Sequence, residues 1–402
     1  MQFPTRFSDL PEYVFPRLRA LLDPHPGGGE ALHMSIGEPQ HAFPEFVGDI
    51  VARNAAGFGR YPPNDGTPEL RAAISAWLTR RYGLEPVDPD TAIMALNGTR
   101  EGLFNACIAL CPERKNGGTP AVLLPNPFYQ CYGAAALAAG AEPVFVNAPE
   151  ESGFLPDFSR VPEEILDRTA IAYLCSPSNP QGAVASEEYW TALIDLAEAH
   201  DFRIFADECY SEIYRDAPPP GVLQVASAKG ADTERVVSFH SLSKRSNLPG
   251  LRSGFVCSGP RNIAAVKQLR AYAGAPLPLP LQRAAEAVWA DESHVAENRA
   301  LYQRKFTLSD SVLGNFPGYS PPRAGFFLWL RVGDGEGAAL KLWREKGVRV
   351  LPGRYLSRTE SPALGGGDPG REYIRVALVA GIEDVTRGLN AIADCLGDEM
   401  SE

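Results

Sequence analysis

Short runs of β-branched and aromatic residues alternate with helical patterns through the middle of the chain. The runs lie at 91–96, 121–125, 143–147, 170–175, 203–207, 236–240 and 253–257. Between them lie segments such as 68–83, in which apolar residues return at helical spacing. This alternation is typical of a mainly parallel sheet that is covered by helices on both faces. We therefore predict a seven-stranded α/β domain over residues 49–290.

The pattern changes after the proline-rich segment at 276–282. A long polar helix is predicted at 294–314, and separated strands are predicted at 326–332, 348–352 and 373–379. These elements indicate a smaller α+β domain over residues 291–402. We expect the N-terminal segment, residues 1–48, to join this smaller domain.

Composition and charge narrow the class of protein. The formal net charge of the 402 residues is -11, whereas broad affinity for nucleic acid or anionic lipid requires a basic face, so neither partner is expected. No apolar stretch approaches the roughly 20 residues of a membrane-spanning helix, and the N-terminus lacks a signal-peptide pattern. We therefore predict a cytoplasmic protein. The 7 cysteines form no CxxC pair and the 6 histidines no HExxH motif, so we predict no metal site.

Polar residues follow several of the predicted strands, at the sheet edge where open α/β sheets bind ligands. Gly98 lies in NGTREGLF, a turn into a helix whose free backbone N–H groups and dipole suit a phosphate. Asn179 lies between two prolines in SPSNPQG, and Asp207 ends the fifth strand. A buried acid needs a cation or a donor, so Asp207 serves either a ligand or a structural ion pair or helix cap.

The segment SLSKRSNLPGLRSG at 241–254 carries the strongest chemical signal. A lysine in a packed site loses solvation, which lowers its pKa and makes the neutral amine available for Schiff base formation. Ser241 and Ser243 lie beside Lys244, and Arg252 follows eight residues later. These hydroxyl and guanidinium donors suit a dianionic phosphate.

Six segments occur along the chain in a characteristic order. They are SIGEP at 35–39, YPPNDG at 61–66, SPSNPQG around Asn179, Asp207 with Tyr210, the segment around Lys244, and YIRVALV around Arg375. This ordered set spans nearly the whole chain and resembles the class I aminotransferases of fold type I, which depend on pyridoxal 5′-phosphate. The resemblance implies that fold, that cofactor, and amino acids and 2-oxo acids as substrates.

The resemblance also implies a role for each matching residue. Lys244 would bind the cofactor as a Schiff base and then move the substrate proton, and Asp207 would keep the pyridine nitrogen protonated. Asn179 and Tyr210 would hydrogen bond the ring oxygen, and Tyr129 would stack on the ring face. The residues that would hold the phosphate are Gly98, Thr99, Arg100, Ser241, Ser243 and Arg252.

Substrate binding and assembly follow from the same resemblance. Arg375 would bind the substrate α-carboxylate through a bidentate pair that a lysine could not imitate, with Gly37 and Asn179 beside it. Tyr61 would reach the phosphate of a second subunit, which implies a homodimer with shared active sites.

Within the family, several segments are most similar to bacterial N-succinyl-diaminopimelate aminotransferases of lysine biosynthesis. They are SIGEPQHAFPEF, PNPFYQCYGAA, DECYSEIY, FHSLSKRSNLPGLRSGF and LPGRYLSR. In this interpretation 2-oxoglutarate and glutamate are the amino partners. A substrate with a distal carboxylate needs a second cation, for which Arg270 is our first hypothesis.

Other activities remain open at this stage. The same residues would serve a C–S lyase or an aspartate, aromatic or LL-diaminopimelate aminotransferase, because a fold does not decide a reaction. Ser241 to Lys244 also matches the SxxK motif of penicillin-recognising enzymes, but the SDN and KTG motifs are absent. A regulator that senses the cofactor would need a DNA-binding domain, and few residues precede SIGEP.

Overall fold

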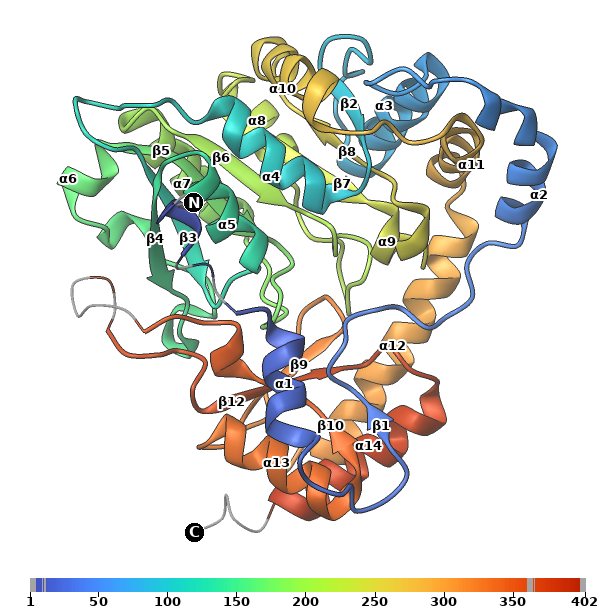
Figure 1. The fold of residues 1–402 in the computed structure, drawn as a ribbon, viewed down its shortest axis with the longest axis vertical. Helices are drawn as coiled ribbons and strands as arrows, with labels where there is room; N and C mark the ends of the chain where they lie inside the picture. The colour runs from blue at the N-terminus through green and yellow to red at the C-terminus, as the bar shows by residue number, and fades with distance from the viewer. Residues whose placement is uncertain (1–4, 9, 11, 360–363, 365, 398–402) are drawn as a thin grey trace.

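A seven-stranded sheet forms the centre of the larger unit (Figure 1). The computed structural model describes residues 5–8, 10, 12–359, 364 and 366–397. The strands are β2 (Ile93–Leu96), β3 (Ala121–Asn126), β4 (Glu142–Asn147), β5 (Thr169–Cys175), β6 (Arg203–Asp207), β7 (Val236–Ser241) and β8 (Gly254–Cys257). Their order is β2-β8-β7-β6-β5-β3-β4, and β8 runs opposite to the other six strands. The predicted mainly parallel sheet is confirmed.

Helices cover both faces of this sheet (Figure 1). They include α3 (Pro68–Tyr82), α4 (Thr99–Leu110), α5 (Gln130–Ala138), α6 (Glu163–Leu166), α7 (Glu187–Ala199), α8 (Val222–Lys229), α10 (Pro260–Ala273) and α11 (Leu279–Ala290). Tyr173 of β5 shares a core with α4, α5 and α10, whereas Leu174 shares one with α7 and α8. Successive side chains of a strand point to opposite faces, which is why β5 reads as a continuous apolar run.

The smaller unit has its own three-stranded antiparallel sheet, in the order β11-β12-β9. Its strands are β9 (Phe327–Arg331), β11 (Leu351–Pro352) and β12 (Tyr373–Ala377). Three helices pack around this sheet: α12 (Ser293–Leu313), α13 (Gly335–Lys346) and α14 (Ile382–Leu396). The long polar helix predicted at 294–314 is therefore confirmed as α12.

The strand predicted at 348–352 divides into two. Its first half is β10 (Val348–Arg349), which pairs in parallel with β1 (Leu32–His33). Its second half is β11, which pairs with β12. Val350 lies between them and is fully buried. The segment passes from one sheet to the other at Val350. The apolar run at 348–352 does not reveal this change of sheet.

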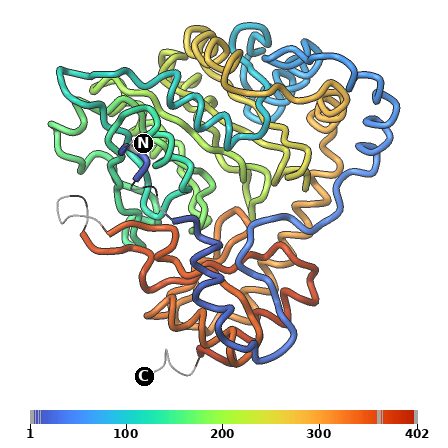
Figure 2. The backbone as a smooth tube through the Cα atoms, in the orientation of Figure 1, coloured from blue at the N-terminus to red at the C-terminus, as the bar shows by residue number. Residues whose placement is uncertain are grey.

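The N-terminal segment lies against the smaller unit. Figure 2 shows its trace beside the C-terminal segments before it runs up to α2 (Phe46–Arg53). Besides the pairing of β1 with β10, α1 (Val14–Leu22) shares an apolar cluster with Trp343 of α13. These contacts place residues 14–33 against the smaller unit, whereas Thr5–Phe7 lie beside α5 of the larger unit and α2 packs on α11 (Figure 1), so the predicted domain boundaries stay a prediction. Among the described residues, no helix is long and apolar enough to span a bilayer.

Candidate active site

A cavity lies between the carboxyl ends of the large sheet and the smaller unit. Its volume is about 390 Å³, which is typical of small-molecule sites. Strands β5, β6 and β7 are adjacent, so the residues that follow them converge here. The predicted site residues that line it are Gly37, Thr99, Arg100, Tyr129, Asn179, Asp207, Tyr210, Ser241, Ser243, Lys244, Arg252 and Arg375. The structure thus brings together residues from distant parts of the chain.

Lys244 lies on the short helix α9 (Leu242–Arg245), which begins directly after β7. Ser241 caps this helix, since its Oγ accepts a hydrogen bond from the backbone N–H of Ser243 at 3.1 Å. The Nζ of Lys244 donates to the carbonyl oxygen of Gly37 at 2.5 Å and lies 5.3 Å from the centre of the Phe326 ring. Burial lowers the pKa of Lys244 to about 8, which favours the neutral amine that attacks a carbonyl.

Asp207 ends β6, where it pairs in register with Cys175 of β5 and Phe239 of β7. Its Oδ2 accepts a hydrogen bond from the hydroxyl of Tyr132 at 2.6 Å, and its Oδ1 accepts one from the backbone N–H of Cys209 at 3.3 Å. The carboxylate is 6% exposed, so these donors satisfy an acid that is otherwise costly to bury.

Tyr132 is a site residue that sequence reasoning missed. Its ring stacks on Tyr173 at 4.5 Å between centroids, and it lines the same cavity as Asp207. The signal was present, because Tyr132 follows the predicted Tyr129 by one helical turn in PNPFYQCY. Burial raises the pKa of Tyr132 well above its usual value, so the hydroxyl stays a donor at neutral pH.

The N-terminus of α4 and Arg252 form a cradle that fits a phosphate. Gly98 precedes the helix with φ 86° and ψ 151°, and a Cβ placed on it would lie 2.1 Å from the Nη2 of Arg252. The guanidinium therefore occupies the space that a side chain at position 98 would fill. The hydroxyls of Ser241 and Ser243, 2.9 Å apart, line the same cavity. Helix N–H groups, hydroxyls and a guanidinium are the donors that phosphates prefer.

Arg375 of β12 reaches the cavity from the smaller unit. Its Nη1 donates to Oδ1 of Asn179 at 2.9 Å, and its Nη2 donates to the carbonyl oxygen of Ser35 at 2.8 Å. Its Nε is buried without a hydrogen-bond partner in the described part of the chain. Burial lowers the pKa of Arg375 to about 10, so it remains charged at neutral pH. A buried cation with a spare donor fits a carboxylate ligand.

Tyr210 and Tyr129 differ in their surroundings. Tyr210 is 8% exposed, and burial raises its pKa well above the usual value, so it is a neutral phenol at neutral pH. The hydroxyl of Tyr129 accepts a hydrogen bond from the Nε of Arg100 at 2.6 Å. Both line the cavity as predicted, and their contacts with a cofactor ring stay a prediction.

Two expected residues lie elsewhere. Tyr61 is fully exposed and does not line this cavity, so its role in a second subunit stays a prediction. Arg270 is only 1% exposed, and its Nε donates to Glu101 at 2.5 Å. The hypothesis that Arg270 binds a second substrate carboxylate is wrong, because its guanidinium lies outside the cavity and already has a carboxylate partner.

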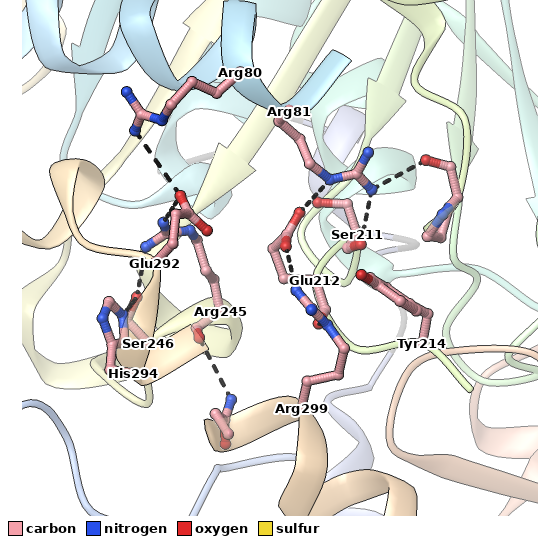
Figure 3. Close-up of polar contacts among 12 residues, drawn as sticks. Arg80, Arg81, Ser211, Glu212, Tyr214, Arg245, Ser246, Glu292, His294 and Arg299 are labelled. Atoms are coloured by element: carbon pink, nitrogen blue, oxygen red, sulfur yellow. Dashed lines mark hydrogen bonds and ion pairs between the residues drawn. The ribbon is translucent and has the colours of Figure 1, made fainter. Parts of the chain in front are cut away.

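Ion pairs anchor the segments that follow the central site residues (Figure 3). Arg245, next to Lys244, binds Glu292 at 2.7 Å, and Arg80 approaches the same carboxylate at 3.9 Å. Glu212, two residues after Tyr210, lies between Arg81 at 2.6 Å and Arg299 at 2.8 Å. Helices α3 and α12 thereby hold the main chain around Lys244 and Tyr210.

Comparison with known proteins identifies the family. A family model described as aminotransferase class I and II matches residues 30–391. The solved structure of an aminotransferase from Neisseria meningitidis is 39% identical, with a TM-score of 0.93 over 98% of this chain and 100% of that one. Aminotransferase AspB from Helicobacter pylori is 32% identical, with a TM-score of 0.88 over 98% and 99% of the two chains. LL-diaminopimelate aminotransferase from Dehalococcoides mccartyi is 29% identical over 98% of this chain and 99% of that protein.

The family match takes in both sheets and the site segments from Ser35 to Arg375. The phosphate cradle and the buried carboxylate fit a phosphorylated pyridine, and the partly neutral amine of Lys244 fits its aldehyde. By sequence, fold and site chemistry, this chain belongs to the class I and II aminotransferases, enzymes of fold type I that use pyridoxal 5′-phosphate.

Proposed function

We propose that this aminotransferase transfers an amino group between N-succinyl-LL-2,6-diaminopimelate and 2-oxoglutarate, with Lys244 as its cofactor lysine. The observation that carries the residue assignment is the meeting of Lys244, Asp207 and Arg375 in one cavity. The substrate assignment rests on the likeness of the segments at 35–46, 125–135, 207–214, 239–255 and 351–358 to that subfamily. A cytoplasmic location remains part of the proposal.

Each residue has a task in this proposal. Bound pyridoxal phosphate supplies an electron sink when the substrate Cα loses its proton. Lys244 Nζ would take that proton from Cα and deliver it to C4′ of the cofactor, and the carboxylate of Asp207 would accept a hydrogen bond from the pyridine N–H. Asn179 orients Arg375 through the contact at 2.9 Å, so that the guanidinium faces the α-carboxylate. The phosphate is held at Gly98, Thr99, Arg100, Ser241, Ser243 and Arg252.

Arg100 replaces Arg270 as the candidate for the distal carboxylate. Among the described residues, the cationic side chains that line the cavity are Arg100, Lys244, Arg252 and Arg375. The last three have roles at the cofactor or the α-carboxylate. The backbone N–H of Arg100 belongs to the phosphate cradle, while its side chain extends to Tyr129, which orients the guanidinium through Nε. Its remaining N–H donors suit a second carboxylate.

Substitution of Arg100 tests this role. We expect Arg100→Ala to raise the KM for 2-oxoglutarate about tenfold or more, because a hydrogen bond to a charged group contributes about 1.5–3 kcal/mol. The KM for a monocarboxylic 2-oxo acid such as pyruvate should stay within about twofold, since it has no distal carboxylate. An equal rise for both acids would remove Arg100 from the distal site.

LL-diaminopimelate itself is the second candidate donor, because a relative with that name matches nearly the full length of both chains. A donor panel separates the two substrates. Purified enzyme is mixed with 2-oxoglutarate and either the N-succinylated or the free diamine, and glutamate formation is measured. The proposal requires the acylated donor to give the higher kcat/KM, and a preference for the free diamine would replace it.

Assembly is the remaining part of the proposal. We infer a homodimer in which Tyr61 reaches the active site of a second subunit, and the full exposure of this side chain supports the inference. Analytical ultracentrifugation should give a molecular mass in solution of two copies of the chain. Mixing inactive Lys244→Ala with inactive Tyr61→Ala subunits should restore part of the activity in hybrid dimers. A fully active monomer would contradict the inference.

A further inference from the structure

A buried chain of polar side chains lies behind the active site. The Nζ of Lys305, on α12, contacts Nε2 of His41 at 2.7 Å and the carbonyl oxygen of Leu378 at 2.8 Å. Nδ1 of His41 contacts Oδ1 of Asn298 at 3.0 Å. Lys305 is only 2% exposed although it forms no ion pair with a carboxylate in the described part of the chain. Burial lowers the pKa of Lys305 to about 7, so its amine is only partly charged at neutral pH and is held by hydrogen bonds to His41 and Leu378.

One arrangement of protons satisfies the whole chain. Neutral His41 accepts from Lys305 at Nε2 and donates from Nδ1 to Asn298. Asn298 then donates from Nδ2 to the carbonyl oxygens of Lys244 and Arg245, at 3.4 Å each, and accepts from Asn247 at 3.1 Å. Burial lowers the pKa of His41, which is consistent with the neutral ring. Asn298 thus donates to the lysine segment through Nδ2 and accepts from that segment, at Asn247, through Oδ1.

The chain joins the three segments that form the substrate side of the cavity. His41 ends the loop in which the carbonyl of Ser35 binds Arg375 and the carbonyl of Gly37 binds Lys244 Nζ. Leu378 follows Arg375 by three residues, so Lys305 also holds the end of the strand that presents the guanidinium. Asn298 holds the main chain of Lys244 itself.

We propose that His41 and Lys305 are positioning residues that hold Arg375 and the loop at 35–41 in register with the amine of Lys244. The proposal rests on the roles given above to Lys244 and Arg375. Within the described part of the chain, the side chains of His41 and Lys305 form no hydrogen bond with the residues of the phosphate cradle, so their loss should act first on Arg375 and the loop at 35–41 and change cofactor affinity less. A misplacement of about 1 Å in reacting groups lowers rates by about 100-fold.

Four variants test this proposal. His41→Ala removes the link, whereas His41→Gln retains one donor and one acceptor and should recover most of the activity. Lys305→Met retains the apolar stem and removes the amine that donates to His41 and Leu378. Lys115→Met is the matched control, because the ammonium of Lys115 also binds main-chain carbonyl oxygens, those of Thr169, His200 and Asp201, which lie away from the cavity.

The assay uses purified holoenzyme with glutamate as donor, so that its result does not depend on the identity of the other substrate. We expect His41→Ala and Lys305→Met to lower kcat/KM about 10- to 100-fold, while the dissociation constant of pyridoxal phosphate stays within about twofold. Urea unfolding of each variant separates lost positioning from lost folding. If His41→Ala does not fold, the comparison of His41→Gln, Lys305→Met and Lys115→Met decides.

Two results would overturn the positioning role. One is that His41→Ala and Lys305→Met have the same kcat/KM as Lys115→Met. The other is a fall in kcat/KM that is matched by an equal rise in the dissociation constant of pyridoxal phosphate. Failure of the site assignment has a different signature, since Lys244→Ala would then keep a covalent, borohydride-reducible cofactor.

Discussion

Alanine in place of Gly98 should damage the cofactor site through a single added carbon. Gly98 has φ 86° and ψ 151°, a region that is essentially restricted to glycine. Its missing side chain also leaves room for Arg252, whose Nη2 would lie 2.1 Å from the new Cβ. Arg252 must therefore move, and it loses the hydrogen bond from Nη1 to the carbonyl of Pro249 at 2.8 Å.

The expected size of the effect has two parts. Backbone strain in this region costs about 1–3 kcal/mol, which lowers the free energy of unfolding of the cofactor-free protein. Displacement of Arg252 removes hydrogen bonds to a charged phosphate, each of which contributes about 1.5–3 kcal/mol. At about 1.4 kcal/mol per tenfold change, the dissociation constant of pyridoxal phosphate should rise about 10- to 100-fold.

Gly140→Ala provides the control, because Gly140 also has a positive φ of 77° but no atom within 4 Å of the added Cβ. Cofactor binding is measured by absorbance titration of each apoenzyme, and stability is measured by urea unfolding. Gly140→Ala should lose stability and keep wild-type cofactor affinity. If Gly98→Ala also binds pyridoxal phosphate with wild-type affinity, the cradle at the start of α4 is not the phosphate site.

Three further predictions concern the rest of the site. The pKa of Lys244 is lowered to about 8, and only the neutral amine attacks an aldehyde, so the rate at which apoenzyme captures pyridoxal phosphate should fall about tenfold per pH unit below pH 8 and level off above it. Stopped-flow absorbance measures this rate, and a rate that keeps rising to about pH 10 would show that the lysine has an ordinary pKa. Arg375→Lys should raise the KM for glutamate about 10- to 100-fold at unchanged cofactor affinity, and an unchanged KM would contradict a bidentate carboxylate contact. Tyr132→Phe should lower the free energy of unfolding of apoenzyme by about 1–3 kcal/mol, because buried Asp207 loses a donor at 2.6 Å; equal urea midpoints would refute this.

Most of the fold and much of the site follow from local sequence patterns. Each of the seven large-sheet strands begins and ends within two residues of its predicted position. Most of them are buried on both faces and therefore form short runs rich in apolar residues. The site residues at the carboxyl ends of these strands could be predicted because the carboxyl ends of parallel strands meet at one edge of the sheet. Asn179, Asp207 and Lys244 were found in this way, and β5, β6 and β7 place them side by side.

The residues that were missed depend on partners far away in sequence. Arg270 resembled a free cation because its partner Glu101 lies 169 residues earlier. His41 and Lys305 are 264 residues apart, and neither lies at the end of a large-sheet strand. Burial and pairing of charged groups depend on tertiary packing, whereas hydrophobic periodicity reports only on the local element.

The larger and the smaller unit contribute unequally to the proposed cofactor site and the proposed substrate site. A variant that loosens the contact between the two units should therefore affect the two sites differently. The phosphate cradle and Asp207 come from the large sheet and its helices, whereas Arg375 comes from the smaller sheet. Arg375 meets the larger unit through Asn179 and the N-terminal segment through the carbonyl oxygen of Ser35. In the proposed site the cofactor is held by residues of the larger unit, with Tyr61 of a second subunit, whereas the substrate is held by residues of both units. Weakening the contact between the units should raise KM at constant cofactor affinity, while damage within the large sheet should change both.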